Sequence, residues 1–298
     1  MPEQHLIIGG FILVSRWKSS AVLAVSALAV LGLAGCGSQD NPSSDAKKEP
    51  AALELMATDA AGSLQKVADT VGKATSVSFT MEGKSEGEPT KGKGVATLGS
   101  DRRVEMTMED PKEGPTTARI IGSAMYIAVP PAEQAEYDGK KWLKMDAAMA
   151  GEAGSEAMSS LLDQLDPAQT LKQMIAGAGG TVVGQEAIAG VQTVHYTAVV
   201  PVAAYLTAVP DATVRAALEK EFTKLGVKEV KVDLWADEQY QLRRVRSFTN
   251  DANDVTIDYT EYGKPVTIDV PPAAETADFA EILKGLQDSL AGLEDLQG

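Results

Sequence analysis

The sequence predicts an α+β domain in which one large curved antiparallel sheet, a half-barrel, wraps around amphipathic helices. Roughly ten segments alternate between apolar and polar residues, and this period of two is typical of strands with one dry face and one wet face. A few other segments repeat apolar residues every three or four positions, which indicates helices. Many strands with few helices favour the α+β class.

The elements follow one another without a linker after Pro50, so the sequence predicts one domain over residues 53–272. The stretch GKSEGEPTKGKG, residues 83–94, is predicted to be turns. Helices are expected at 53–71, 158–165, 171–177, 211–226 and, within a C-terminal tail of residues 273–298, at 276–297. Strands are expected at 76–82, 103–109, twice within 118–129, and at 140–146, 180–187, 191–200, 229–236, 241–249, 254–262 and 266–270.

An export signal precedes this domain. Arg16 and Lys18 lie ahead of a short apolar run, residues 21–33, that ends in small residues, the pattern of a secretory signal peptide. Thirteen helical residues rise about 20 Å, which is less than the roughly 30 Å hydrocarbon core of a bilayer. A permanent spanning helix is therefore the weaker interpretation. A second apolar patch ahead of these charges, residues 6–14, suggests that translation starts at Val14.

The signal ends at Leu33-Ala34-Gly35-Cys36, which resembles a bacterial lipobox. The resemblance implies that Cys36 receives a diacylglyceryl group and that residues 1–35 are removed. It also implies an anchor at the extracytoplasmic face of the cell membrane. An ordinary signal peptide with a chance cysteine is the alternative, but Cys36 is the only cysteine and has no disulfide partner.

Composition limits the possible partners. The net charge is −15, and removal of the leader, which carries one net positive charge, makes it −16. Such acidity argues against nucleic acid and against electrostatic binding to anionic lipid. Residues 36–52 are polar and rich in Ser and Pro, so we expect a flexible tether whose 14 central residues reach about 20 Å.

A series of soft motifs resembles the LppX/LprG-type lipoproteins of actinobacteria, which are similar in fold to the lipoprotein carriers LolA and LolB. The resemblance spans most of residues 53–272, and the tail helix has no counterpart in it. It implies a half-barrel with an apolar cavity that holds the acyl chains of lipids or lipoglycans. The motifs are AMYIAVP (124–130), KKWLKMD (140–146), DPAQTLKQM (166–174), VGQEAIAGVQTVHYTAVV (183–200), VDLWADEQYQLRRV (232–245) and VTIDYTEYGKPVTIDVPP (255–272).

Alternation places six apolar side chains on dry strand faces, and the resemblance implies that part of this space is a cavity. Methionine is frequent among them, and its flexible thioether lines promiscuous apolar grooves as well as filling gaps in cores. Ordinary core packing is the alternative. The predicted cavity-lining residues are Phe79, Met81, Val104, Met106, Met108 and Ile127.

Residue types argue against catalysis and against a metal. His195 is the only histidine after cleavage and lies between threonines on a strand, so it makes a poor triad or metal site and is predicted at the surface. The motif Ser63-x-x-Lys66 resembles an acylation motif but lacks its partner motifs. Residues 250–254 lack the spacing of a calcium loop and are predicted to form a turn.

Two functions therefore remain open from the sequence. The first is a monomeric, membrane-anchored carrier or chaperone that binds lipid or lipoglycan and needs no cofactor beyond its own anchor. The second is a non-enzymatic sensor or regulator that uses the same fold to bind a membrane protein of the envelope. A hydrolase is a distant third, because no nucleophile–base pair is visible.

The anchor gives the first testable prediction. Cys36→Ala removes the only thiol, so the precursor should escape lipoprotein signal peptidase and take up no radioactive palmitate. Normal palmitate labelling of this variant would contradict the assignment of the anchor.

Overall fold

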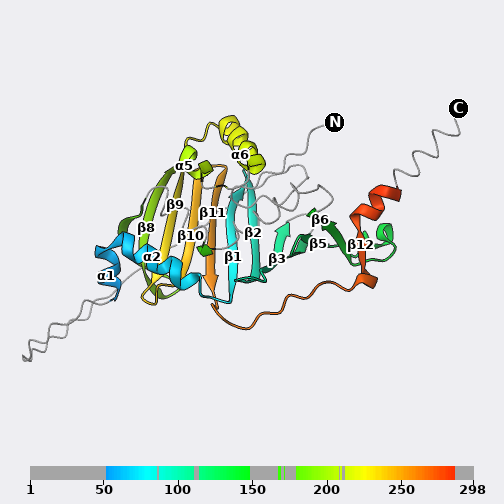
Figure 1. The fold of residues 1–298 in the computed structure, drawn as a ribbon, viewed down its shortest axis with the longest axis horizontal. Coiled ribbons are helices and arrows are strands. Elements are labelled where there is room, and N and C mark those ends of the chain that lie inside the picture. Colours follow the sequence, from blue (N-terminus) through cyan, green and yellow to red (C-terminus); the bar gives the residue numbers. More distant parts are fainter. Residues whose placement is uncertain are drawn as a thin grey trace, which may run out of the picture.

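The computed structural model describes residues 52–85, 87–110, 114–147, 167–168, 171, 179–207, 209 and 212–285. In these ranges the chain forms one open sheet of twelve strands in the order β12-β6-β5-β4-β3-β2-β1-β11-β10-β9-β8-β7 (Figure 1). Every pair is antiparallel except β12 with β6. The predicted fold class is thus confirmed.

Most predicted elements are present within a few residues of their expected ends. The helices are α1 (Ala52–Thr58), α2 (Ala60–Val71), α5 (Val202–Thr207) and α6 (Ala212–Leu225). The strands are β1 (Ser76–Ser85), β2 (Glu88–Thr97), β3 (Arg103–Asp110), β4 (Gly114–Ile121), β5 (Ala124–Ala128), β6 (Trp142–Asp146), β7 (Thr181–Ile188), β8 (Val191–Pro201), β9 (Glu229–Asp237), β10 (Leu242–Asn250), β11 (Asn253–Thr260) and β12 (Thr276–Asp278).

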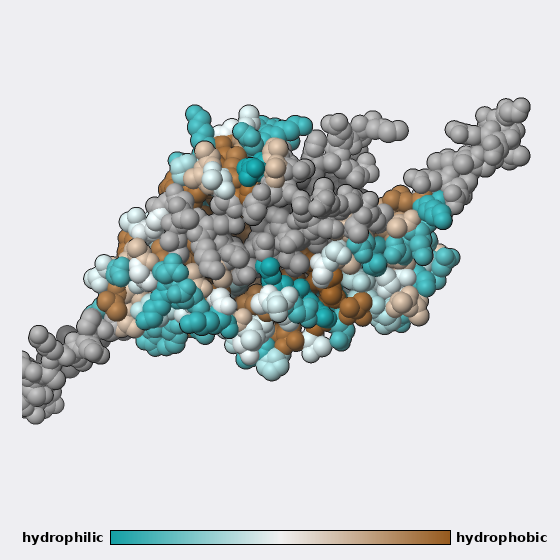
Figure 2. All heavy atoms as spheres, in the orientation of Figure 1, coloured by the Kyte–Doolittle hydropathy of each residue, from teal (hydrophilic) through white to brown (hydrophobic). Residues whose placement is uncertain are grey.

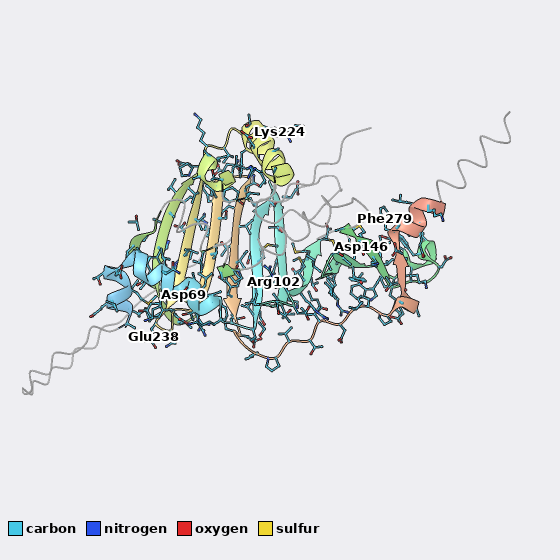
Figure 3. The ribbon with its side chains drawn as sticks, in the orientation of Figure 1. Asp69, Arg102, Asp146, Lys224, Glu238 and Phe279 are labelled. Atoms are coloured by element: carbon cyan, nitrogen blue, oxygen red, sulfur yellow. The ribbon has the colours of Figure 1, made fainter. Side chains whose placement is uncertain are left out.

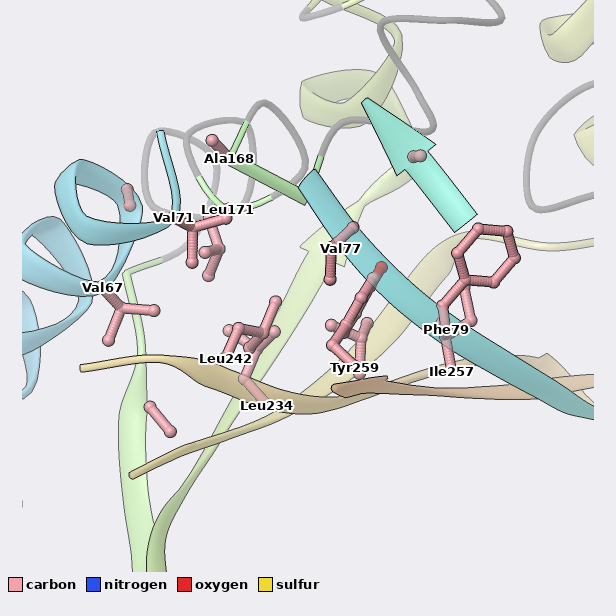
Figure 4. Packing of buried hydrophobic residues seen from close by; sticks show 14 of the residues in the cluster. Val67, Val71, Val77, Phe79, Ala168, Leu171, Leu234, Leu242, Ile257 and Tyr259 are labelled. Carbon is pink, nitrogen blue, oxygen red and sulfur yellow. The ribbon is translucent and has the colours of Figure 1, made fainter. Parts of the chain in front are cut away.

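The helix expected at 53–71 is divided in two. Asp59 lies between α1 and α2, and its carboxylate accepts a hydrogen bond from the Gly62 N–H at 3.0 Å. A carboxylate in this position caps the amino terminus of the second helix. Both helices pack on one face of the sheet, which we call the inner face, and α2 contributes Leu64, Val67 and Val71 to the core there (Figure 4).

The prediction of turns throughout residues 83–94 was wrong. Most of this stretch belongs to β1 and β2, and β2 is a central strand that pairs with β1 on one side and β3 on the other. The inward positions of β2 include Gly92 and Gly94, which give no apolar alternation for sequence analysis to detect. Its lysines, Lys91 and Lys93, are exposed on the opposite, outer face.

The prediction of a strand at 266–270 was also wrong. These residues belong to a segment, 261–275, that connects β11 with β12, ends in a 3-10 helix (Ala273–Glu275) and that we call the strap (Figure 1). Arginine side chains, rather than the hydrogen bonds of a paired strand, attach the strap to the sheet. Nη1 of Arg103 donates to the Ile268 carbonyl, and Nη1 of Arg119 donates to the Asp269 carbonyl, each at 2.9 Å.

After the strap, β12 extends the sheet beyond β6, so the first three residues of the helix expected at 276–297 form a strand instead. The helix starts at Phe279, at the opposite end of the molecule from Asp69 of α2 (Figure 3). Within the described ranges, no helix is long and apolar enough to cross a membrane. The leader, the tether, the helix expected at 158–165, most of that at 171–177, and the tail after Gly285 lie outside the described residues.

Removal of one strap contact should destabilise the protein measurably. In Arg119→Ala, the Asp269 carbonyl loses its donor and Glu105 loses an ion-pair partner at 2.6 Å. A hydrogen bond to a charged group contributes about 1.5–3 kcal/mol, so urea unfolding should show a loss of about that size. Lys91→Ala, which breaks an exposed pair with Glu109 at 3.6 Å, is the control and should cost less than about 1 kcal/mol. Equal losses in both variants would contradict a structural role for the strap.

Candidate functional site

The six predicted cavity-lining residues all lie on the inner face. Strand register places Phe79, Met106 and Ile127 in one row across the sheet, with Gly94 and Ala118 between them. A second row joins Met81, Gly92, Met108 and Thr116, and a third joins Val77, Ala96, Val104, Ile120 and Met125. The six residues that alternation placed on dry strand faces thus share one face of the sheet, and their role in binding stays a prediction.

Burial differs along these rows. Met81, Val104 and Met106 are 2–4% exposed and belong to the core cluster, whereas Met108 and Ile127 are only partly buried. The partly buried inner positions continue on β5 and β6 with Met125, Leu143 and Met145. On the β3–β6 side, the inner positions of β5 and β6 are therefore only partly buried.

Two glycines on β2 shape this face. A Cβ built on Gly94 would lie 2.5 Å from Cζ of Phe79, and a Cβ built on Gly92 would lie 2.6 Å from Sδ of Met108. The side chains of Phe79 and Met108, which come from the strands on either side, therefore lie across β2 and fill the space that its own side chains would occupy. Sequence analysis did not identify these glycines as part of the inner face. The Lys-Gly-Lys-Gly alternation at residues 91–94 was the signal that could have indicated a strand there.

The other side of the inner face is closed. Tyr196 of β8 is fully buried, and its hydroxyl donates to the Met56 carbonyl of α1 at 3.0 Å. Burial raises the pKa of Tyr196 to about 12, so its hydroxyl keeps its proton and this hydrogen bond at physiological pH. Leu171 and α2 cover Leu234 and Leu242 beside it (Figure 4). This side is a packed core.

The outer face carries paired charges. Arg244 and Asp258 form a two-point ion pair, and so do Arg246 and Asp254. The hydrogen bonds from Arg246 lower the pKa of Asp254, although burial opposes this. A hollow of about 620 Å³ lies over these pairs and is also lined by lysine, glutamate and threonine side chains. Met81 is the only one of the six predicted residues that lines this hollow. The walls of the hollow are polar and therefore do not suit an acyl chain.

His195 lies on the outer face, as expected, but it is largely covered. Its ring stacks on Trp235 with centroids 4.2 Å apart. Nδ1 lies 3.1 Å from Glu186 and Nε2 lies 3.2 Å from Asp233. Burial disfavours the charged form of Asp233, but hydrogen bonds from neighbours including His195 and Lys231 outweigh it and lower the pKa of Asp233. His195 thus ties β7, β8 and β9 together.

The two other motifs that resembled chemical sites, Ser63-x-x-Lys66 and residues 250–254, have structural roles. Ser63 is a buried residue of α2, whereas the Lys66 ammonium lies over the Tyr240 ring at 4.1 Å. Residues 250–253 include the turn between β10 and β11, in which the Asn250 side chain accepts from the Ala252 N–H. Across the described ranges, no three His, Cys, Asp or Glu side chains are grouped closely enough to hold a metal ion.

Two curated proteins of Streptomyces are similar in sequence to this chain. An uncharacterised 31.2 kDa protein of Streptomyces griseus, from the rplA–rplJ intergenic region, is 33% identical over 182 residues, 58% of this chain and 59% of that protein. A protein of Streptomyces coelicolor described as a "putative lipoprotein" is 25% identical over 173 residues, 56% of this chain and 52% of that protein. The matches span little more than half of either relative. No family model matches the sequence.

Two solved structures, LprF and the lipoprotein LppX, are also similar to this chain. LprF from Mycobacterium bovis is 17% identical, with 72% of this chain and 97% of that chain covered and a TM-score of 0.47. LppX from Mycobacterium tuberculosis is 11% identical, with 70% and 97% covered and a TM-score of 0.45. The solved structures similar to this chain thus include an LppX-type protein of the kind that the sequence motifs resemble.

The glycines of β2 give a graded prediction. Gly94→Ala should cost more stability than Gly92→Ala, because its Cβ would lie 2.5 Å from the Glu105 carbonyl oxygen as well as from Phe79. At Gly92 the closest atom is the flexible end of Met108, so we expect about 1–3 kcal/mol from overpacking there. Gly184→Ala, where nothing lies within 4 Å of the new Cβ, is the control and should be nearly neutral. Three equal unfolding free energies would show that β2 does not need its glycines.

Proposed function

We propose that the mature chain is an extracytoplasmic, membrane-anchored lipoprotein that binds the acyl chain of a lipid or lipoglycan on its inner face. The observation that carries this proposal is the surface between β2 and β6, where three cross-strand rows contain no charged residue. The lipobox at Cys36 and the lipoprotein name of the Streptomyces coelicolor relative support the anchor.

The side chains on this surface suit a flexible apolar ligand. Met106, Met108, Met125 and Met145 lie on it from three strands, and thioether side chains adapt their shape to irregular apolar partners. The space over β2 is filled only by the ends of the Phe79 and Met108 side chains. Rotation of these ends would make room for an acyl chain without breaking the strand ladder.

A second function is favoured by one observation. Val104 and Met106 are 3–4% exposed, which is also what a filled core would show. A filled inner face would suit the regulator, which binds an envelope protein through another surface and carries no lipid. In both functions the chain acts as a monomer, holds no cofactor other than its anchor and catalyses no reaction.

Replacement of Met108 by tryptophan distinguishes the two functions. If the inner face holds an acyl chain, Met108→Trp should lose co-purifying lipid in native mass spectrometry of protein from its own host. Its stability should fall by less than the roughly 1–3 kcal/mol of an overpacked core, because Met108 is only partly buried. Val77→Trp, at a position that is 1% exposed in the core cluster, is the matched control and should lose stability by at least that amount.

The lipid content of the unsubstituted parent protein decides between the two functions. A parent that carries no lipid, together with Met108→Trp losing as much stability as Val77→Trp, would indicate a filled core and favour the regulator.

A further inference from the structure

The hollow on the outer face has no part in the proposed function. It extends over the middle of the sheet, from Glu109 of β3 across β2, β1, β11 and β10 to Trp235 of β9, and its volume is about 620 Å³. Pockets of about 300–1,000 Å³ hold small ligands in many proteins. Figures 1 and 2 look onto the side of the sheet that carries α2, so the hollow lies on the side turned away from the viewer. A ligand in it would not compete for space with one on the inner face.

Two cross-strand rows form the floor of the hollow, and all but one of their side chains are polar. Adjacent strands lie about 4.8 Å apart, so the strand register fixes the spacing of these polar groups. The first row joins Lys93, Thr80, Asp258, Arg244 and Trp235, and the second joins Lys91, Glu82, Thr256 and Arg246.

The charges that line the hollow cancel, although the whole chain has a net charge of −15. An anion in the hollow would meet four carboxylates, and a cation would meet four cationic groups. Neither kind of ion gains a net attraction from such a lining, so the balance favours an uncharged polar ligand. The cationic residues are Lys91, Lys93, Arg244 and Arg246, and the carboxylates belong to Glu82, Glu109, Asp254 and Asp258.

The two arginine–aspartate pairs leave hydrogen-bonding groups of both kinds unused. Arg246 donates from Nε and Nη2 to Asp254 at 2.8 and 2.7 Å, and Arg244 donates from the same two atoms to Asp258 at 2.5 and 2.8 Å. In the described part of the chain, Nη1 of each arginine has no acceptor. A guanidinium has five N–H donors and a carboxylate accepts at about four lone-pair sites. Each pair therefore presents free donors beside free acceptors.

Four other side chains of the hollow add to this supply. The Thr80 and Thr256 hydroxyls, the Glu82 carboxylate and the Lys93 ammonium make no hydrogen bond or ion pair with any described residue. A ligand hydroxyl both donates and accepts, so it can bond a carboxylate and a neighbouring N–H group together. The arginines are already held by two bonds each, which reduces the entropy lost when a ligand binds them.

We propose that this hollow binds a neutral saccharide, whose hydroxyls donate to the free carboxylate sites and accept from the arginine Nη1 groups. The two threonine hydroxyls complete the set of partners. The site is separate from the inner face and does not depend on acyl-chain binding there. The saccharide is either free or the head group of a glycolipid, since both present the same hydroxyls.

Binding to defined sugars tests this site. The mature protein is labelled with a fluorophore at Cys36, its only cysteine, and applied to an array of neutral oligosaccharides built from hexoses, pentoses and N-acetylhexosamines. At least one should bind, and calorimetry with the free oligosaccharide then gives its affinity. That affinity should change little with salt, because the ligand carries no charge. Binding to no neutral oligosaccharide, or tighter binding of a sulfated form of the same sugar, would overturn the proposal.

Isosteric variants locate the bound sugar. Thr80→Val and Thr256→Val each remove a hydroxyl, so each should weaken binding about two- to tenfold, as expected for one hydrogen bond. Thr181→Val, on the exposed edge strand β7 outside the hollow, is the matched control and should bind normally. Equal affinities of all three variants and the parent would refute the site.

An arginine variant tests the free Nη1 group. Arg246→Lys keeps the positive charge but loses the planar donor edge, so affinity should fall about tenfold or more. Arg243→Lys is the control, because Arg243 pairs with Asp237 on the same strand β10 but does not line the hollow. Urea unfolding checks that both variants keep their fold. An equal loss of affinity in both would contradict a role for Nη1.

The same oligosaccharide linked to a lipid in phosphatidylcholine vesicles separates the two sources. Complete displacement of the protein from these vesicles by the free oligosaccharide would indicate that the sugar alone is recognised. Tighter binding to the vesicles that Thr256→Val still weakens would indicate a glycolipid head group in the same hollow. Binding to the lipid-linked form alone, unaffected by Thr256→Val, would overturn the proposal. A parent protein without co-purifying lipid would count against the acyl-chain function and leave this result unchanged.

Discussion

The pairing of β1 with β11 is the contact on which the rest of the sheet depends. The remaining antiparallel neighbours mostly follow one another along the chain, whereas this pair joins residues 78–84 to residues 254–260. It links the β2–β6 side with the β7–β10 side. The register is fixed on both faces, because Phe79 meets Tyr259 inside while Thr80 meets Asp258 outside. A slip of one residue would turn Asp258 toward the core.

The two faces of the sheet reinforce this register in different ways. On the outer face, Arg244 pairs with Asp258 from the adjacent strand at matching positions. Exposed ion pairs add little stability individually, but opposite charges at these positions favour one register over its neighbours. On the inner face the same strands contribute Val245 and Ile257 to the core. Burial thus supplies the stability, and the charges help to specify the alignment.

Sequence analysis succeeded where one strand carries its own signal. The alternation around Val104 and Met106 predicted both β3 and its dry face, and most of the other strands followed in the same way. It failed where the signal depends on a partner. Strand β2 is identified by side chains that lie over Gly92 and Gly94 from its neighbours, and the three residues of β12 are too few for any periodicity. The strap is extended because of Arg103 and Arg119, which are more than a hundred residues away in sequence.

The same distinction applies to the proposed site. That six residues share a face follows from alternation, but the space over β2 follows only from the register of three strands. This space is filled by Phe79 and Met108, so an acyl chain bound there would have to displace contacts that already exist. The affinity of such a site is the difference between ligand contacts and side-chain contacts, which is smaller than either.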